Sequence, residues 1–156
     1  MVLKNLIDVD YINYKKPSMV LGFPRCSFKC CTEYGQQICQ NSALANSPDI
    51  EVDYEEVITR YLKSSSKALV IQGLEPFDSW DDLRIFIGRF RARCTDDIVI
   101  YTGYNRAEIG SIVRYLKQFP NIIIKFGRYI PNQQPHYDEV LGVNLASDNQ
   151  YAEKIS

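Results

Sequence analysis

This sequence has little of what marks a membrane protein or a nucleic-acid-binding protein. No apolar run approaches the length needed to span a membrane, and the first sixteen residues lack the apolar core of a signal peptide. The formal net charge is −1, so no excess of basic residues favours binding to nucleic acid or to an anionic membrane surface. We therefore expect a cytoplasmic protein that binds neither nucleic acid nor a membrane.

Histidine is nearly absent as well. His136 is the only one, and we interpret it as a surface residue rather than a metal ligand. Cysteine is present in an odd number, since the chain has 5, and four of them fall between positions 26 and 39. A disulfide framework does not explain this spacing well, and a cytosolic protein keeps its thiols reduced. A ligand role explains the cysteines better.

Length and composition fit one globular domain. The chain has 156 residues, of which 46% are hydrophobic and 24% charged, which is ordinary for a soluble domain with a substantial core. We find no internal repeat, low-complexity segment or linker that would divide it. We expect a single domain over residues 1–156.

Short runs of branched apolar residues alternate with amphipathic segments along the chain. Strands are predicted at residues 18–23, 68–72, 97–101 and 121–126. Helices are predicted to begin after Asp53, Ser79 and Asn105, which are residue types that cap helices. This alternation predicts an α/β fold with a parallel sheet and helical crossovers. Residues 127–156 have no clean periodicity, and we expect a loop with a short closing element there.

The loops that follow the first three predicted strands contain the residues of most chemical interest. The first is the cysteine segment, the second is Gly73-Leu74-Glu75-Pro76, and the third is Thr102-Gly103-Tyr104. In sheets of this kind, ligands bind outside the carboxyl ends of the strands. We therefore expect the three loops to converge on one rim.

The spacing of Cys26, Cys30 and Cys39 favours an iron–sulfur cluster. Thiolates are the usual ligands of such clusters, and a cubane held by three of them leaves one iron free for a substrate or cofactor. The alternatives are a structural zinc site, which normally takes four ligands, and buried cysteines that act as small hydrophobic residues. Cys31 is an alternative to Cys30, although the three-residue gap after Cys26 favours Cys30.

The cysteine pattern resembles that of the radical S-adenosylmethionine superfamily. The superfamily pattern is C-x3-C-x2-C, often followed by a polar residue and Asn. Cys26 and Cys30 match its first half, and Cys39-Gln40-Asn41 is similar to its end. Six extra residues separate the two parts, and Glu33 stands where the third cysteine would fall.

Four further segments resemble, within that superfamily, the activating proteins of anaerobic ribonucleotide reductase. The GLEP sequence at 73–76 is similar to the GGEP loop, with Leu74 in place of the second glycine. Residues 98–109 (IVIYTGYNRAEI) resemble the activase segment that contains YTGY, and residues 126–129 (FGRY) with 146–150 (ASDNQ) are similar to its DGRF and GSSNQ ends. Purely structural interpretations exist for the first two: a turn after a strand, and a strand followed by a glycine turn and a capped helix.

The resemblance implies a fold, two cofactors and a set of site residues. The fold would be a partial (β/α) barrel of mostly parallel strands. Cys26, Cys30 and Cys39 would bind a [4Fe-4S] cluster whose fourth iron chelates S-adenosylmethionine. Gly73 and Glu75 would help bind the methionine end of that cofactor, with Thr102 and Gly103 at its rim. The reduced cluster would cleave it to methionine and a 5′-deoxyadenosyl radical, a reaction that needs no catalytic acid or base.

The resemblance and the small size of the chain together imply a protein substrate. Four or five strands leave one side of a barrel open, which suits a glycine-bearing loop from a large partner. The implied partners are a large glycyl-radical enzyme, anaerobic ribonucleotide reductase, and an electron donor such as flavodoxin or ferredoxin. The alternatives are a short radical enzyme acting on a small molecule or peptide, and a non-enzymatic cluster or zinc protein.

Overall fold

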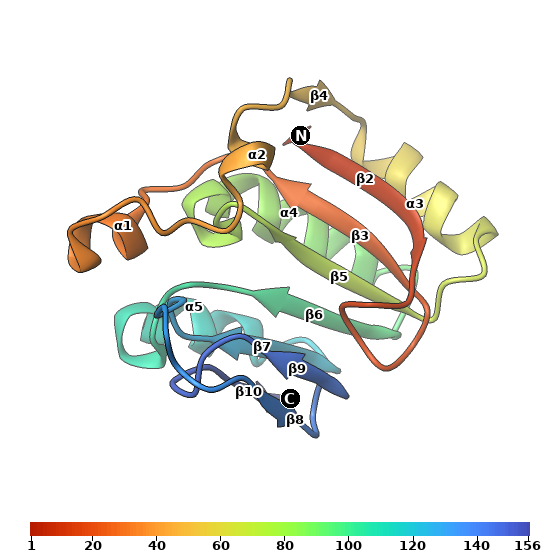
Figure 1. Cartoon of the computed structure of the whole chain (residues 1–156). Coiled ribbons are helices and arrows are strands. Elements are labelled where there is room, and N and C mark those ends of the chain that lie inside the picture. Colours follow the sequence, from red (N-terminus) through yellow and green to blue (C-terminus); the bar gives the residue numbers. More distant parts are fainter.

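The computed structural model describes all residues, 1–156, and contains one six-stranded sheet with its longer helices on one face (Figure 1). The strand order is β10-β7-β6-β5-β3-β2, in which the four central strands are parallel and the two edge strands are antiparallel to their neighbours. The strands are β2 (Asn5–Asp10), β3 (Ser18–Phe23), β5 (Ala68–Gly73), β6 (Asp97–Tyr101), β7 (Ile122–Phe126) and β10 (Tyr151–Lys154).

Shorter elements surround this sheet. Two small antiparallel pairs are formed by β1 (Val2–Leu3) with β4 (Ile50–Glu51), and by β8 (His136–Asp138) with β9 (Val143–Leu145). The helices are α1 (Lys29–Tyr34), α2 (Ser42–Ala45), α3 (Tyr54–Lys63), α4 (Trp80–Arg91) and α5 (Gly110–Leu116), with 3-10 turns at Pro76–Ser79 and Arg106–Ile109. None of the helices has the length and apolar character required to cross a membrane.

The four predicted strands are present within one residue of the expected positions, and the first two predicted helices begin where expected. The third begins after Asn105 as the 3-10 turn Arg106–Ile109, which leads into α5 at Gly110. The terminal segments differ from expectation. The amino-terminal residues form the edge strand β2, and the tail expected to be mostly loop forms β8, β9 and β10. These strands are short or partly exposed, so they lack the continuous apolar runs that identify a buried strand. The sheet is open at both edges, and the partial barrel stays a prediction.

Two of the three predicted capping residues make capping hydrogen bonds, and the third does not. The carboxylate of Asp53 accepts hydrogen bonds from the first turn of α3, and Asn105 forms a reciprocal capping box with Glu108. Ser79 precedes α4 but makes no capping bond, and its hydroxyl is buried without a partner. A 3-10 turn ends at Ser79 and leads directly into α4, so the helix start is built from that turn rather than from a side-chain cap.

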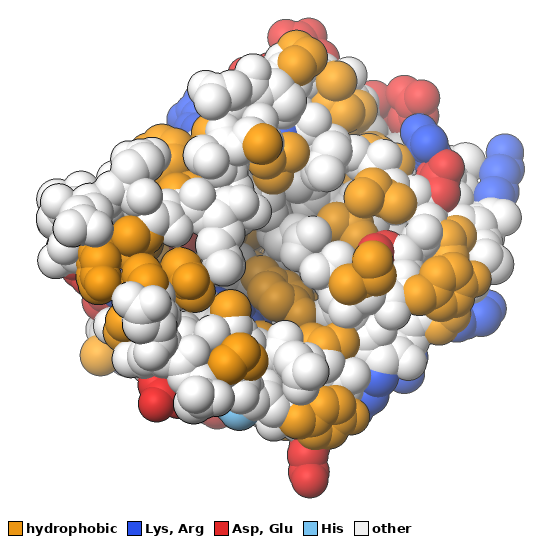
Figure 2. All heavy atoms as spheres, in the orientation of Figure 1, with side chains coloured by type: hydrophobic (Ala, Val, Ile, Leu, Met, Phe, Trp, Pro, Cys, Tyr) orange, Lys and Arg blue, Asp and Glu red, His pale blue; other side chains and the backbone are white.

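The core is divided unequally between the two faces of the sheet. Strand residues such as Leu69 and Ile71 face the helices in a cluster of 23 buried apolar residues, whereas Val70 belongs to a cluster of 8 on the opposite face. That opposite face is covered only by residues 11–17 and the β8–β9 pair, which are joined by a hydrogen bond from the Lys15 amide to the Leu141 carbonyl. The uncovered part is hollowed near its centre (Figure 2).

Candidate metal and cofactor site

A cavity of about 400 Å³ lies at the carboxyl ends of the parallel strands. Its volume is within the range of small-molecule sites, which is about 300 to 1,000 Å³. All seven residues predicted from the sequence to form the site line this cavity: Cys26, Cys30, Cys39, Gly73, Glu75, Thr102 and Gly103. The three loops that follow β3, β5 and β6 therefore converge as the sequence predicts, because parallel strands bring their carboxyl ends to one edge.

The three predicted ligand cysteines come from the segment between β3 and β4. Cys26 lies just after β3, Cys30 lies in the first turn of α1, and Cys39 precedes α2. Burial is the main cause that raises the pKa of the Cys26 and Cys30 thiols to about 11, and the charge of Cys39 contributes to both shifts. Cys39 therefore lies near enough to each of the other two thiols to affect its ionisation, and the positive charge of a bound metal would favour the thiolate form of all three.

The remaining cysteines are placed differently. Cys31 does not line the cavity, although its Sγ lies 3.9 Å from the Sγ of Cys30. Cys94 follows α4, where its sulfur accepts a hydrogen bond from the Asp96 amide over 3.4 Å, and it packs against the helical side of the core. Its placement fits the prediction of an ordinary thiol.

The cysteine set fits a cluster in its chemistry and its setting. Three thiols share one cavity with polar groups from two other loops, so a cluster held there would face space for a further ligand. A backbone amide also points at one of the predicted ligand atoms, because the Phe28 N–H donates to the Sγ of Cys26 over 3.2 Å. No three His, Cys, Asp or Glu side chains form a group that would hold a single metal ion. In a cluster, by contrast, the thiolates bind separate irons.

The turn after β5 depends on a glycine at position 73. Gly73 has φ +111°, and a Cβ there would lie 2.5 Å from the backbone nitrogen of Phe23. A side chain is therefore excluded by both backbone conformation and space. Leu74, which replaces a glycine of the similar GGEP loop, is not among the residues with positive φ, so this turn has no need for a second glycine.

Glu75 is the most constrained polar group in the site. It is 4% exposed, and its carboxylate accepts hydrogen bonds from the Thr102 hydroxyl and the Gly103 amide, both over 2.8 Å, and from the Phe77 amide over 3.2 Å. Burial raises the pKa of Glu75 to about 7 even though these three donors lower it. The loops after β5 and β6 are thus joined through one carboxylate that a cationic ligand group would help to ionise.

Sequence reasoning missed Lys125, which also lines the cavity. It lies in β7 among isoleucines, is 7% exposed, and donates one hydrogen bond from Nζ to the Gly127 carbonyl over 2.8 Å. Burial lowers the pKa of Lys125 to about 8, while the charge of Glu75 acts in the opposite direction. The sequence does contain a signal for this residue, because Lys125 interrupts the otherwise apolar strand Ile122–Phe126. A lysine in such a strand is rarely buried without a ligand or partner.

Asn5 in β2 was missed for another reason, since no strand was predicted there. Its Oδ1 is buried without a hydrogen-bond partner, and the residue lines the same cavity. The site therefore extends from the cysteine segment to the edge strand of the sheet.

Comparison with known families gives one match. The sequence profile of a family described as a 4Fe-4S single cluster domain matches residues 18–150, a range that includes every residue predicted to form the site. No curated protein and no solved structure matches the chain.

Proposed function

This chain belongs to the 4Fe-4S single cluster domain family, and from that premise we propose that it is a radical S-adenosylmethionine enzyme. The proposal goes further and assigns it as an activase that forms a glycyl radical on a large partner, anaerobic ribonucleotide reductase. One observation carries the proposal. The three cysteines and the four predicted cofactor-binding residues, which come from three different loops, all line one cavity.

Each part of the cavity has a role in this proposal. Cys26, Cys30 and Cys39 would hold the cluster, and the buried carboxylate of Glu75 would accept the cofactor ammonium group, supported by Thr102 and Gly103. A reduced cluster held by these cysteines would supply the one electron needed to cleave S-adenosylmethionine to methionine and a 5′-deoxyadenosyl radical.

Lys125 adds a complementary charge to this cavity. Its ammonium group has three N–H donors, of which one bonds to the Gly127 carbonyl. A buried cation with free donors suits a carboxylate, and Glu75 lies near enough to affect its pKa. The pair would therefore bind an α-amino acid group, with ammonium at Glu75 and carboxylate at Lys125.

The size of the cavity supports a macromolecular substrate. About 400 Å³ is near the lower end of the range for small-molecule sites, so one cofactor of nucleoside and amino acid parts would fill most of it. The hydrogen donor would then have to enter from the open face, which a glycine-bearing loop of a protein can do. An electron donor such as flavodoxin or ferredoxin would supply the reducing equivalent.

The proposal is tested by anaerobic reconstitution with iron and sulfide, followed by reduction in the presence of S-adenosylmethionine. We expect about four irons and four sulfides per chain, and formation of 5′-deoxyadenosine when the reduced protein meets the cofactor. Addition of anaerobic ribonucleotide reductase should produce the electron paramagnetic resonance doublet of a glycyl radical on that partner.

Cysteine variants provide the controls. Cys26→Ala, Cys30→Ala or Cys39→Ala should abolish formation of 5′-deoxyadenosine, whereas Cys94→Ala should leave it unchanged. A tightly bound zinc ion in the anaerobically isolated protein, or a cluster that never cleaves the cofactor, would contradict radical chemistry. Cleavage without a radical on the reductase would instead favour a small-molecule or peptide substrate.

A further inference from the structure

Helix α1, which contains Cys30, is not held in place by hydrophobic packing. The helix has six residues, Lys29–Tyr34, and none of them is buried. Its amino-terminal neighbour Phe28 has a left-handed conformation and provides no side-chain cap. A helix this short is not stable by itself in water. Its orientation must therefore depend on contacts with the rest of the protein.

The ion pairs among these contacts involve four charged residues, Lys29, Glu33, Glu108 and Arg128, which we call the α1 charge network. Glu33 Oε2 lies 3.3 Å from Arg128 Nε, and Lys29 Nζ lies 3.5 Å from Glu108 Oε1. Arg128 and Glu108 are themselves joined by two hydrogen bonds of 2.7 Å. The four charges alternate in sign, so each one is next to an opposite charge.

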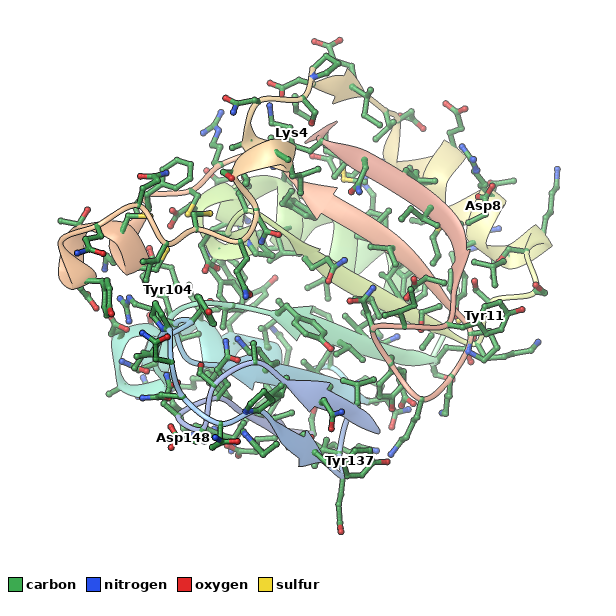
Figure 3. The ribbon with its side chains drawn as sticks, in the orientation of Figure 1. Lys4, Asp8, Tyr11, Tyr104, Tyr137 and Asp148 are labelled. Carbon is green, nitrogen blue, oxygen red and sulfur yellow. The ribbon has the colours of Figure 1, made fainter.

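Within this network, the pair formed by Arg128 and Glu108 is held in place by its surroundings. The side chain of Arg128 is 9% exposed, and its guanidinium together with the Asn105 amide holds the pKa of Glu108 down to about 2. Tyr104, which Figure 3 shows close to α1, places its ring 4.6 Å from the Lys29 ammonium. A bidentate arginine–carboxylate pair fixes the relative orientation of its two side chains and also strengthens the interaction between them.

The network also determines which side of α1 faces the cavity. Lys29 and Glu33 are four residues apart and therefore lie on one face of the helix. With that face against Glu108 and Arg128, Cys30 lines the cavity and Cys31 does not. Their sulfurs are only 3.9 Å apart, so a shift of α1 by about that distance would bring the Cys31 thiol to the place of the Cys30 thiol.

We propose that the α1 charge network selects Cys30 over Cys31 as the cluster ligand by setting the rotation of α1. Arg128 and Glu33 are positioning residues in this account, since they act on the cluster only through the helix. The inference rests on the proposed cluster site but does not depend on cleavage of S-adenosylmethionine. Without the network, either thiol would reach the position of the ligand and the choice between them would weaken.

The test compares Cys30→Ala with Cys31→Ala in three backgrounds: the natural sequence, Glu33→Gln and Arg128→Met. After anaerobic reconstitution, iron and acid-labile sulfide are measured per chain. In the natural sequence we expect Cys31→Ala to retain at least fivefold more cluster than Cys30→Ala. In the Glu33→Gln and Arg128→Met backgrounds this ratio should fall severalfold, because Cys31 can then replace Cys30. A role in overall stability alone would lower both members of a pair and leave their ratio unchanged.

Conservative and remote variants complete the comparison. Arg128→Lys keeps the charge but not the paired hydrogen bonds. In this background the ratio of cluster content between Cys31→Ala and Cys30→Ala should lie between that of the natural sequence and that of Arg128→Met. Arg114→Met removes an exposed arginine of α5 and should keep the ratio of the natural sequence. Because the Glu33 side chain is 58% exposed, Glu33→Gln should fold normally even if Arg128→Met does not. An unchanged ratio in Glu33→Gln, or equal cluster content for Cys30→Ala and Cys31→Ala in the natural sequence, would overturn the inference.

A second measurement separates this inference from the proposed function. If the natural protein takes up no cluster, the proposed function fails, and hydrogen exchange of α1 in the metal-free protein still tests the network. We expect the α1 amides to exchange severalfold faster in Glu33→Gln than in the natural protein, and the difference should shrink in high salt, which screens exposed ion pairs. Equal exchange rates at low salt would overturn the inference.

Discussion

The side chain of Asn41 donates a hydrogen bond to the carbonyl oxygen of Gly73 over 2.9 Å. The two residues are 32 positions apart and belong to different loops of the site. Asn41 follows the third predicted cluster cysteine, and Gly73 opens the turn that leads to Glu75. The bond therefore fixes the end of the cysteine segment against the predicted methionine-binding turn.

Replacing Asn41 by Ala should loosen the cysteine segment. The change removes one hydrogen bond to a buried carbonyl, and we expect a loss of about 1 kcal/mol in the free energy of unfolding. The larger effect should be on the reconstituted protein, in which a chelator should remove iron severalfold faster. Asn46→Ala provides the control, because Asn46 is exposed in the same segment and its side chain makes no hydrogen bond. Equal rates of iron loss for the two variants would show that Asn41 does not hold the segment.

Gly73→Ala should be strongly destabilising. The new methyl group would meet backbone atoms of Phe23 at 2.5 and 2.7 Å, and the backbone would have to keep φ near +111°. We expect the free energy of unfolding to fall by more than about 2 kcal/mol, measured by urea denaturation. Gly88→Ala is the matched change in the interior of α4, where nothing lies near the new Cβ, and it should raise stability by about 0.5 to 1 kcal/mol. A loss below about 0.5 kcal/mol at Gly73 would show that the turn can relax.

The central part of the fold could be predicted because its signals are local and consistent. The strands around Val70, Val99 and Ile123 are buried on both faces, so they consist of nearly continuous branched residues. The edges could not be predicted in this way. Strand β10 has no buried residue and is stabilised by its pairing with β7, a contact between distant segments that no local pattern records.

The site was predictable where its residues directly follow strands, and less so elsewhere. Cys26 lies three residues after β3, Gly73 is the last residue of β5, and Thr102 is the first residue after β6, so topology brings them together. Lys125 and Asn5 enter the cavity from within strands, and only the register of the sheet determines which face a strand residue occupies. The two positions missed are therefore those that depend on pairing rather than on sequence order.

Glu75→Gln should change how stability depends on pH. The pKa of Glu75 is raised to about 7 in the folded protein from an ordinary 4.5, so between these values the folded state keeps a proton that the unfolded state loses. The contribution of Glu75 to stability is therefore complete below about pH 4.5 and is lost as the pH rises through 7. Urea denaturation of the metal-free protein between pH 4.5 and 7.5 should show this decline in the natural protein and a flatter profile in Glu75→Gln.

The control for this pH dependence is Glu139→Gln, which removes an exposed carboxylate and should keep the natural profile. Lys125 does not complicate the window, because its pKa is lowered to about 8 and its own contribution increases only above that pH. If Glu75→Gln and the natural protein lose stability in parallel over this range, Glu75 is already ionised in the folded state.

Lys125→Met should separate binding from stability. The substitution keeps a long side chain but removes an ammonium group that burial disfavours, so the free energy of unfolding should stay the same or rise. Binding of S-adenosylmethionine should weaken by at least about tenfold, because a charged hydrogen bond to its carboxylate is worth roughly 1.5 to 3 kcal/mol. Anaerobic titration calorimetry of the reconstituted protein measures this, with Lys117→Met, an exposed lysine after α5, as the control. Unchanged affinity in Lys125→Met would place the carboxylate elsewhere in the cavity and leave the buried ammonium without a ligand.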